Sequence, residues 1–325
     1  MKNIFFFQKF LFLMSLMMSI LISISSNSLI GIWMGMEINL FSVITMFSMN
    51  EKKNSEKAIL IYFLVQSISS VMMLFSSMMM TTNFSNTNIF MIMFFLSLFM
   101  KLGMFPFHFW MLATIEGLSW TICFILLTIQ KIIPLITMMM MMQKKMIIFM
   151  IIMNSIAASI SGLSSFSLRK IMSFSSMNHL SLMLLSAILS KNMLKLYFFV
   201  YTIMSFISVY LFNKNNLNFI FQVFSIPKNK MLMMNFLITF FSMAGIPPFM
   251  GFIPKMIVIM KMTEFLIILP MILILITNTV ASFFYIRMCF SNLLMNMNMK
   301  KTLLKTDKSW FIPLILIFSP MIYIM

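Results

Sequence analysis

FMKLGMFPFHFW, residues Phe99–Trp110, is the stretch of sequence that decides the fold of this chain. The mostly apolar run IFMIMFFLSL precedes it, and another apolar run follows after a short polar loop. A lysine at the depth of Lys101 in a bilayer costs about 2.5–3.5 kcal/mol. Pro106 removes a helical hydrogen bond, and irregular backbone at this depth survives only against protein or a water-filled cavity. A charge and a helix break in one apolar segment therefore predict an ion pathway.

Composition excludes a soluble protein. Hydrophobic residues make up 62% of the chain and charged residues 9%, whereas a soluble domain carries about 25% charged residues. The fold class predicted is an all-α polytopic membrane protein. Both cysteines, Cys123 and Cys289, lie in apolar runs and are interpreted as inert thiols. No CxxC, GxGxxG, P-loop or HExxH pattern occurs, so we expect no bound flavin, nucleotide, haem, iron–sulfur cluster or metal.

Eleven apolar runs are near the length needed to cross a bilayer. They are Ile4–Ile24, Leu29–Phe47, Ala58–Met79, Ile89–Met111, Ser119–Met141, Met146–Ser164, Ile171–Ile188, Leu194–Phe212, Met231–Met260, Glu264–Phe290 and Trp310–Met325. The first is long for a signal peptide, and no clear A-x-A-like cleavage site follows it.

The net charge of +17 at pH 7 is a topology signal. The lysines lie in short loops between spans, which argues against nucleic-acid binding. Of the 23 lysines and arginines, we count fifteen on the side of the N-terminus, five on the other side and three inside spans. The positive-inside rule therefore predicts an N-terminus in the matrix or cytoplasm. An odd number of spans puts the C-terminus on the opposite side.

Four ionisable residues are predicted at bilayer depth: Glu37, Lys101, Lys131 and Lys255. Lys255 lies near enough to the end of its span to snorkel, whereas Lys131 does not. Desolvation disfavours the charged form of a lysine, and a nearby carboxylate restores it. Lysines placed in this way can load and release protons, and Glu37 is the expected counter-ion of Lys101. The set has no structural justification unless water and partners reach it.

Two histidines complete the ionisable set in or near the spans. His179 is interpreted first as a hydrogen-bonded packing residue. His108 follows the break after Lys101, where it either serves a proton path or only finishes the broken helix.

An internal repeat relates two broken segments. The run FSMAGIPPFMGFIPKMIVIM, residues 241–260, combines Gly and Pro breaks with Lys255, as the opening stretch combines them with Lys101. Each broken segment is the fourth of five spans. Since five is odd, the second block is expected to be inverted relative to the first. Interrupted segments at corresponding positions of two halves indicate a transport site. We therefore expect two five-helix repeats, 1–143 and 144–299, and a C-terminal helix in 300–325.

Five motifs carry a resemblance to a known family. They are GMEINL, QKIIP, SLRKIMSFSSMNHL, PFHFW followed by EGLSW, and AGIPPFMGFIPKM, and the resemblance extends over nearly the whole chain. They resemble the antiporter-like membrane subunits of respiratory complex I, in a mitochondrial form that lacks the first helices of its longer bacterial relatives. The abundance of methionine, 46 residues, would also fit a mitochondrial coding bias.

The resemblance implies a core subunit that takes part in proton translocation across the inner mitochondrial membrane, driven by quinone reduction elsewhere in the complex. Glu37 would be the carboxylate of a first half-channel and Lys101 its broken-helix partner. Lys131 would be a central relay residue, Lys255 the broken-helix residue of a second half-channel, and His179 a residue near the central hydrophilic axis. NADH, FMN, iron–sulfur clusters and ubiquinone would be bound by other subunits, with no cofactor in this chain.

The implied partners are other membrane-arm and accessory subunits of complex I and membrane lipids. The family usually has a proline and an acidic residue after HFW, where this chain has Met111, Leu112 and Ala113, and Ser165–Phe166 replaces a polar residue common before SLRK. Two alternatives stay open. One is a stand-alone cation/proton antiporter, and the other is a structural membrane spacer without its own proton path.

Overall fold

The computed structural model describes residues 2–49, 55–81, 87–141, 143–224, 230–265 and 268–296. Regular structure in these ranges is helical, apart from an isolated antiparallel bridge between Ser167 and Phe219. The chain divides into two compact units, Met1–Gln143 and Lys144–Met325. The prediction of an all-helical membrane protein is confirmed. The predicted span Trp310–Met325 lies outside the described residues.

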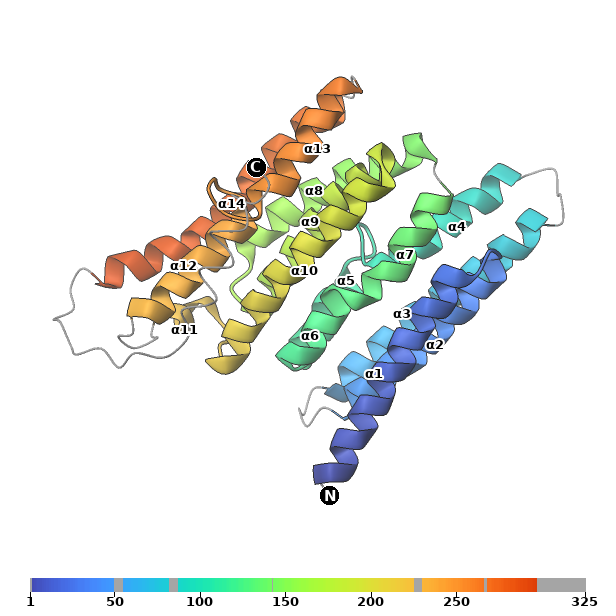
Figure 1. Cartoon of the computed structure of the whole chain (residues 1–325), viewed down its shortest axis with the longest axis horizontal. Helices are drawn as coiled ribbons and strands as arrows, with labels where there is room; N and C mark the ends of the chain where they lie inside the picture. Colours follow the sequence, from blue (N-terminus) through green and yellow to red (C-terminus); the bar gives the residue numbers. More distant parts are fainter. Residues whose placement is uncertain are drawn as a thin grey trace. The chain divides into compact units, whose positions relative to one another are not determined.

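The first unit contains seven described helices, drawn from blue to green in Figure 1. They are α1 (Lys2–Ser25), α2 (Leu29–Ser48), α3 (Ser55–Thr81), α4 (Thr87–Leu102), α5 (Phe109–Gly117), α6 (Trp120–Leu127) and α7 (Ile129–Met140). Helix α2 packs against α1 and α3, while α3 packs also against α4 and α5. Helix α7 contacts α1, α2 and α4, so α2, α3, α4 and α7 can surround one site.

The second unit contains the other seven described helices. They are α8 (Lys144–Ser164), α9 (Leu168–Leu189), α10 (Lys191–Lys214), α11 (Ile220–Phe224), α12 (Lys230–Ala244), α13 (Phe252–Glu264) and α14 (Ile268–Asn296). Helix α9 is the centre of this unit, because nearly all of its residues are buried and it packs against α8, α10 and α13. Helix α12 packs against α10 and α14.

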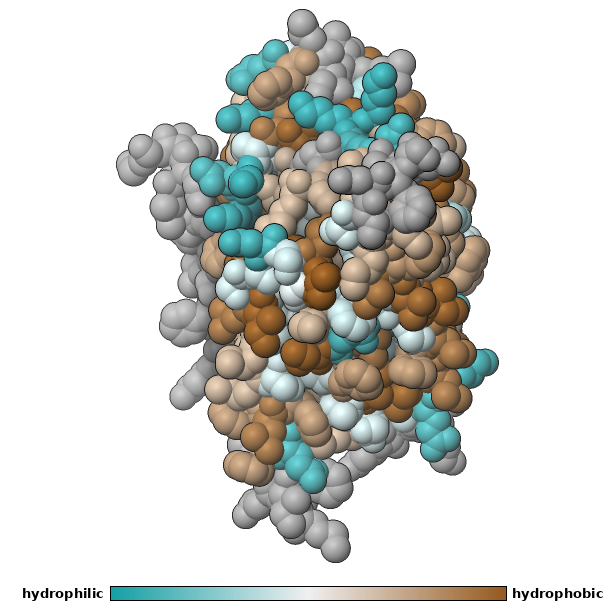
Figure 2. All heavy atoms as spheres, turned by 90° about the vertical axis from the view of Figure 1, so that its right-hand side faces the viewer, coloured by the Kyte–Doolittle hydropathy of each residue, from teal (hydrophilic) through white to brown (hydrophobic). Residues whose placement is uncertain are grey.

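Eight of the described helical spans are long and apolar enough to cross a membrane. Helices α4 and α12 are shorter, with apolar parts at Asn88–Leu102 and Met233–Ala244. Both end at the glycine-containing breaks that the sequence indicates. Figure 2 shows a face on which apolar side chains, in brown, dominate the middle, while hydrophilic residues gather mainly towards its two ends. Large exposed apolar side chains such as Phe10, Phe41 and Leu64 fit a lipid-facing surface.

The two broken segments begin with the same backbone motif. At the end of α4, Gly103 has φ +66°, its N–H donates to Met100 O at 3.2 Å, and the next N–H, of Met104, donates to Phe99 O at 3.1 Å. This pair of bonds is the Schellman motif, and a positive φ at its C′ position favours glycine. It satisfies two carbonyls that the end of the helix would leave without partners.

At the end of α12 the motif recurs. Gly245 has φ +76°, its N–H donates to Ser242 O at 3.1 Å, and the N–H of Ile246 donates to Phe241 O at 3.2 Å. The lysines differ in their position relative to the break. Lys101 lies two residues before its glycine, whereas Lys255 lies on α13, after the break.

Candidate functional site

Lys101 lies at the C-terminal end of α4, one residue before the helix ends at Leu102. Its side chain is 9% exposed. The ammonium Nζ donates to the thioether sulfur Sδ of Met36 on α2, at 3.2 Å. A thioether is a weak acceptor. In the described part of the chain, the ammonium of Lys101 is therefore held in the interior by a weak hydrogen bond rather than by an ion pair.

Glu37 interacts with Lys101 without a direct hydrogen bond between their side chains in the described structure. No ion pair joins the two side chains in the described part of the chain. The carboxylate oxygen Oε1 of Glu37 is buried without a hydrogen-bond partner. Glu37 nevertheless interacts electrostatically with Lys101 and with the buried Tyr62. The prediction that Glu37 is the counter-ion of Lys101 stays a prediction, since the described structure shows an electrostatic interaction between the two residues but no salt bridge.

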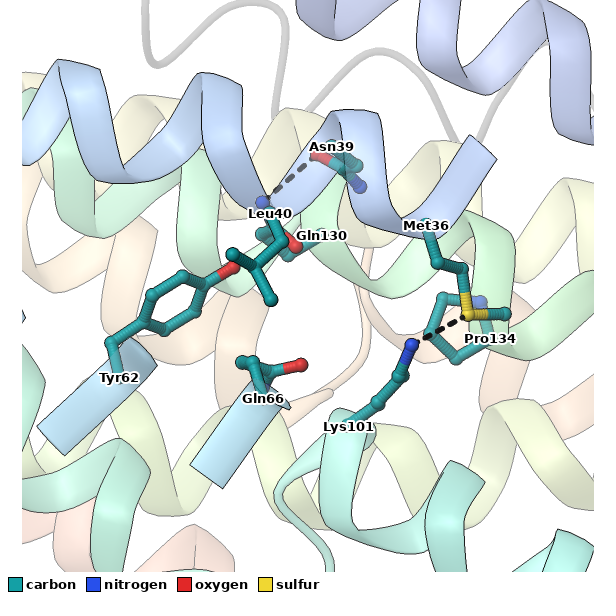
Figure 3. A pocket seen from close by; sticks show the side chains of 8 residues that line it. All are labelled: Met36, Asn39, Leu40, Tyr62, Gln66, Lys101, Gln130 and Pro134. Carbon is teal, nitrogen blue, oxygen red and sulfur yellow. Dashed lines mark hydrogen bonds between the residues drawn. The ribbon is translucent and has the colours of Figure 1, made fainter. Parts of the chain in front are cut away.

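A pocket opens beside the Lys101 ammonium group (Figure 3). About 300 Å³ of space lies among its lining side chains, and this volume includes space open to the surroundings. Helices α2, α3, α4 and α7 supply its lining, which consists of Met36, Asn39, Leu40, Tyr62, Gln66, Lys101, Gln130 and Pro134. Half of these side chains are uncharged with polar ends. The pocket therefore offers a buried cation several oxygen acceptors within one cavity.

An amide pair forms one wall of the pocket. The Nε2 atom of Gln130, on α7, donates to Oδ1 of Asn39, on α2, at 3.0 Å. Figure 3 shows this bond, with the Lys101 ammonium at the opposite side of the pocket. The bond ties the helix that carries Glu37 to the helix that carries Lys131.

Lys131 follows Gln130 directly and is 2% exposed. The predicted span Ser119–Met141 is divided just before it, because α6 ends at Leu127 and α7 begins at Ile129. At the intervening Thr128, the hydroxyl and the N–H both donate to Phe124 O, and the N–H of Lys131 donates to Thr128 O. The helix axis is therefore irregular beside this lysine.

His108 begins α5, and its carbonyl accepts hydrogen bonds from the N–H groups of Met111 and Leu112. Its side chain makes no capping bond. The imidazole is buried against Phe105 and Phe109, with Nδ1 lacking a hydrogen-bond partner. The backbone of His108 accepts the first hydrogen bonds of α5, and its side chain interacts with the backbone of Pro106, inside the break.

Lys255 bridges the break in the second unit. From the first turn of α13, its Nζ donates to Ala244 O at 2.8 Å and to Met243 O at 3.4 Å. These are carbonyls of the last turn of α12, where the helix dipole favours a cation. Lys255 is therefore not snorkelling in this structure but stabilises the end of the preceding half-helix.

His179 lies on α9, the central helix of the second unit, and is 3% exposed. Its Nδ1 is hydrogen-bonded to the hydroxyl of Tyr197 on α10, at 3.0 Å, and its ring lies 5.2 Å from that of Tyr201. Helix α13, which carries Lys255, packs against α9. A buried imidazole with a hydroxyl partner satisfies a packing role and also provides a group that can exchange a proton.

The structure adds residues that the sequence analysis did not single out. Met36, Asn39, Tyr62, Gln66 and Gln130 surround Lys101. Of these, Met36 and Asn39 lie in or beside GMEINL, and Gln130 opens QKIIP, so two of the five motifs contain pocket residues. Nothing in the sequence indicates that they share one cavity.

Comparison with known proteins defines the class. Residues 26–284 match the family described as NADH:quinone oxidoreductase/Mrp antiporter, transmembrane. A chain of respiratory complex I from Thermus thermophilus, solved with bound aureothin, has the same fold, with a TM-score of 0.84. The match covers 98% of this chain and 79% of that one at 14% sequence identity.

Closer relatives define the branch of this family. NADH-ubiquinone oxidoreductase chain 2 of Locusta migratoria is 35% identical over 311 residues, with 92% of this chain and 90% of the relative covered. The Anopheles gambiae protein of the same name is 37% identical over 309 residues, with 91% and 89% covered. This chain belongs to the NADH-ubiquinone oxidoreductase chain 2 family. It is a multi-pass membrane subunit of NADH:ubiquinone oxidoreductase, respiratory complex I.

Proposed function

We propose that this subunit moves protons across the inner mitochondrial membrane, coupled to NADH oxidation and ubiquinone reduction elsewhere in the complex. The single observation that carries the proposal is the setting of Lys101. A buried lysine at the end of a broken half-helix, whose ammonium donates to a thioether in the described part of the chain, faces a pocket with several oxygen acceptors. Such a lysine has a flexible stem and alternative partners, as a group that loads and releases protons requires.

The proton-pathway residues proposed are Glu37, Lys101, Lys131, Lys255 and His179. Glu37 modulates Lys101 through space, so a change at the carboxylate alters the energy of the lysine charge. Moving one charge through 100 mV costs about 2.3 kcal/mol, and a buried charge pair can store energy of this order. Lys131, in the irregular α6–α7 segment, is the next relay residue. Lys255 and His179 serve a second half-channel.

The repeat organisation is part of the proposal. Two inverted five-helix repeats, 1–143 and 144–299, would be followed by a C-terminal spanning helix in 300–325, giving eleven spans. The matching Schellman ends at Gly103 and Gly245 support it. With the excess of positive charge on the N-terminal side, the N-terminus would face the matrix and the C-terminus the intermembrane space. Other membrane-arm and accessory subunits and lipids would cover the apolar surface.

Two alternatives make different predictions. Membership of the chain 2 family disfavours a stand-alone cation/proton antiporter, which would transport ions without the rest of the complex. A structural spacer would hold its neighbours together without a proton path of its own, so neutralising its buried lysines would leave pumping unchanged.

The test is the number of protons moved per NADH oxidised by complex I reconstituted into vesicles. Lys101→Ala is expected to lower this ratio, while Lys145→Ala, at the start of α8, serves as a control for the loss of a lysine. A normal ratio in assembled Lys101→Ala complex would support the spacer.

A further inference from the structure

The hydrogen bond between the side-chain amides of Asn39 and Gln130 uses one polar atom of each amide. These atoms are Nε2 of Gln130 and Oδ1 of Asn39. An amide group has both an acceptor oxygen and a donor nitrogen, so Oε1 of Gln130 and Nδ2 of Asn39 take no part in this bond. Asn39 is 3% exposed. Because its partner fixes the nitrogen of Gln130, the orientation of the Gln130 oxygen is fixed as well.

The Lys101 ammonium has more donors than its present partner can accept. It carries three N–H groups, and its hydrogen bond in the structure goes to Met36 Sδ. A charged group in a low-dielectric interior needs strong acceptors. Oxygens of Gln66, Tyr62 and Gln130 line the same pocket, and the four-carbon stem of lysine allows the ammonium to turn towards them.

Gln130 also provides a main-chain acceptor beside Lys131. In a regular helix, the N–H of residue 134 would donate to the carbonyl of residue 130. Residue 134 is proline, which has no N–H. Gln130 therefore carries a side-chain oxygen on the pocket wall and a carbonyl that the helix does not bond in the usual way. Both belong to the residue that precedes Lys131.

We propose that Gln130, held by Asn39, is a positioning residue that directs the proton of Lys101 towards Lys131. The inference rests on the proton-pathway function proposed above. The Lys101 ammonium turns from Met36 towards a water molecule held by the Gln130 oxygen. It gives that water one proton and becomes a neutral amine. The water passes a proton on to the neutral amine of Lys131, which becomes an ammonium, and the water is regenerated.

Met36 has a defined part in this scheme. Its thioether holds the ammonium away from the amide wall in the conformation observed. A weak acceptor suits this role, because a carboxylate at the same position would hold the ammonium more tightly. Met36 and Gln130 line the same pocket, so the Lys101 ammonium can move from one to the other by a change in side-chain conformation.

The test uses assembled complex I in vesicles and measures protons moved per NADH oxidised. Gln130→Leu keeps the size of the side chain but removes the amide. It is expected to cause most of the loss that Lys101→Ala causes. Gln143→Leu is the matched control, because the side-chain Nε2 of Gln143 also donates a hydrogen bond, to Met91 Sδ at 2.8 Å, but Gln143 does not line the pocket.

A swap separates positioning from packing. Gln130→Asn alone shortens the side chain and is expected to lower the ratio. The double variant Asn39→Gln/Gln130→Asn restores the combined length of the pair and is expected to recover most of the loss. A merely structural amide pair would lower assembly or thermal stability in Gln130→Asn but leave the proton-to-NADH ratio of the assembled complex unchanged. The swap also serves if Gln130→Leu fails to assemble.

The outcomes distinguish this inference from the function on which it rests. If Lys101→Ala lowers the ratio but Gln130→Leu and Gln130→Asn do not, the positioning role is wrong and the proton pathway stands. Failure of the swap to recover the loss also overturns the positioning role. If Lys101→Ala leaves the ratio unchanged, both proposals fail.

Discussion

Lys255 Nζ donates to Ala244 O at 2.8 Å, across the break between α12 and α13. The lysine lies alongside Gly245, where a Cβ atom would come within 2.8 Å of Nζ and of Cδ. The positive φ of this glycine and the path of the lysine thus depend on the same missing side chain. The helix break and the buried lysine of this segment therefore depend on each other.

Gly245→Ala is expected to destabilise the second unit. The left-handed conformation of an alanine costs about 1–2 kcal/mol, and the new methyl group would also displace Lys255. Gly103→Ala has a similar backbone cost at φ +66°, but its nearest contacts, to Met111 and Trp110, are at 3.3 Å. The temperature at which each variant chain is lost from purified complex I should fall further for Gly245→Ala. An equal decrease in this temperature for the two variants would show that displacing Lys255 adds nothing to the destabilisation.

Tyr197→Phe is expected to lower stability by about 1–3 kcal/mol, because it leaves the buried His179 Nδ1 without its hydroxyl partner. Tyr210→Phe, at an exposed position of the same helix, is the control. Thermal unfolding of the purified complex measures both. If the two variants are equally stable, the His179–Tyr197 bond contributes nothing measurable.

Arg287 is expected to be a structural charge. Its guanidinium donates to Leu163 O at 2.8 Å and to Ser165 O at 2.9 Å, holding the segment between α8 and α9, and it lies over the ring of Phe166. Lysine cannot reproduce this two-pronged geometry. Arg287→Lys should therefore lower thermal stability while the assembled complex pumps normally per NADH oxidised. Reduced pumping at full assembly would place Arg287 in the proton path.

Much of the fold could be predicted from local sequence. The spans predicted at Leu29–Phe47 and Met146–Ser164 lie within α2 and α8, because continuous apolar runs leave few alternatives in a membrane. The glycines and prolines within the apolar runs also indicate the positions of the two breaks. The division at Thr128 was not, since an isolated threonine in an apolar run carries no breaker signal.

The residues that line the pocket are harder to predict from the sequence than the buried lysines. A buried charge is visible in a sequence because it violates an apolar pattern, and Lys101 and Lys131 stand out for that reason. Asn39 and Gln130 are 91 residues apart, and their pairing depends on how α2 and α7 pack. The partner of the Lys101 ammonium is unpredictable for a related reason: Met36, which precedes Glu37, is the residue whose side chain reaches the ammonium.

The most direct test of the central claim is the proton-to-NADH ratio of complex I carrying Lys101→Arg, beside Lys101→Ala. Arginine keeps a positive charge at this position but does not give up its proton in proteins. If Lys101 must release a proton, the arginine complex should assemble, oxidise NADH and pump as poorly as the alanine complex. Normal pumping by the arginine complex would show that only the charge is needed, and would contradict a proton pathway through Lys101.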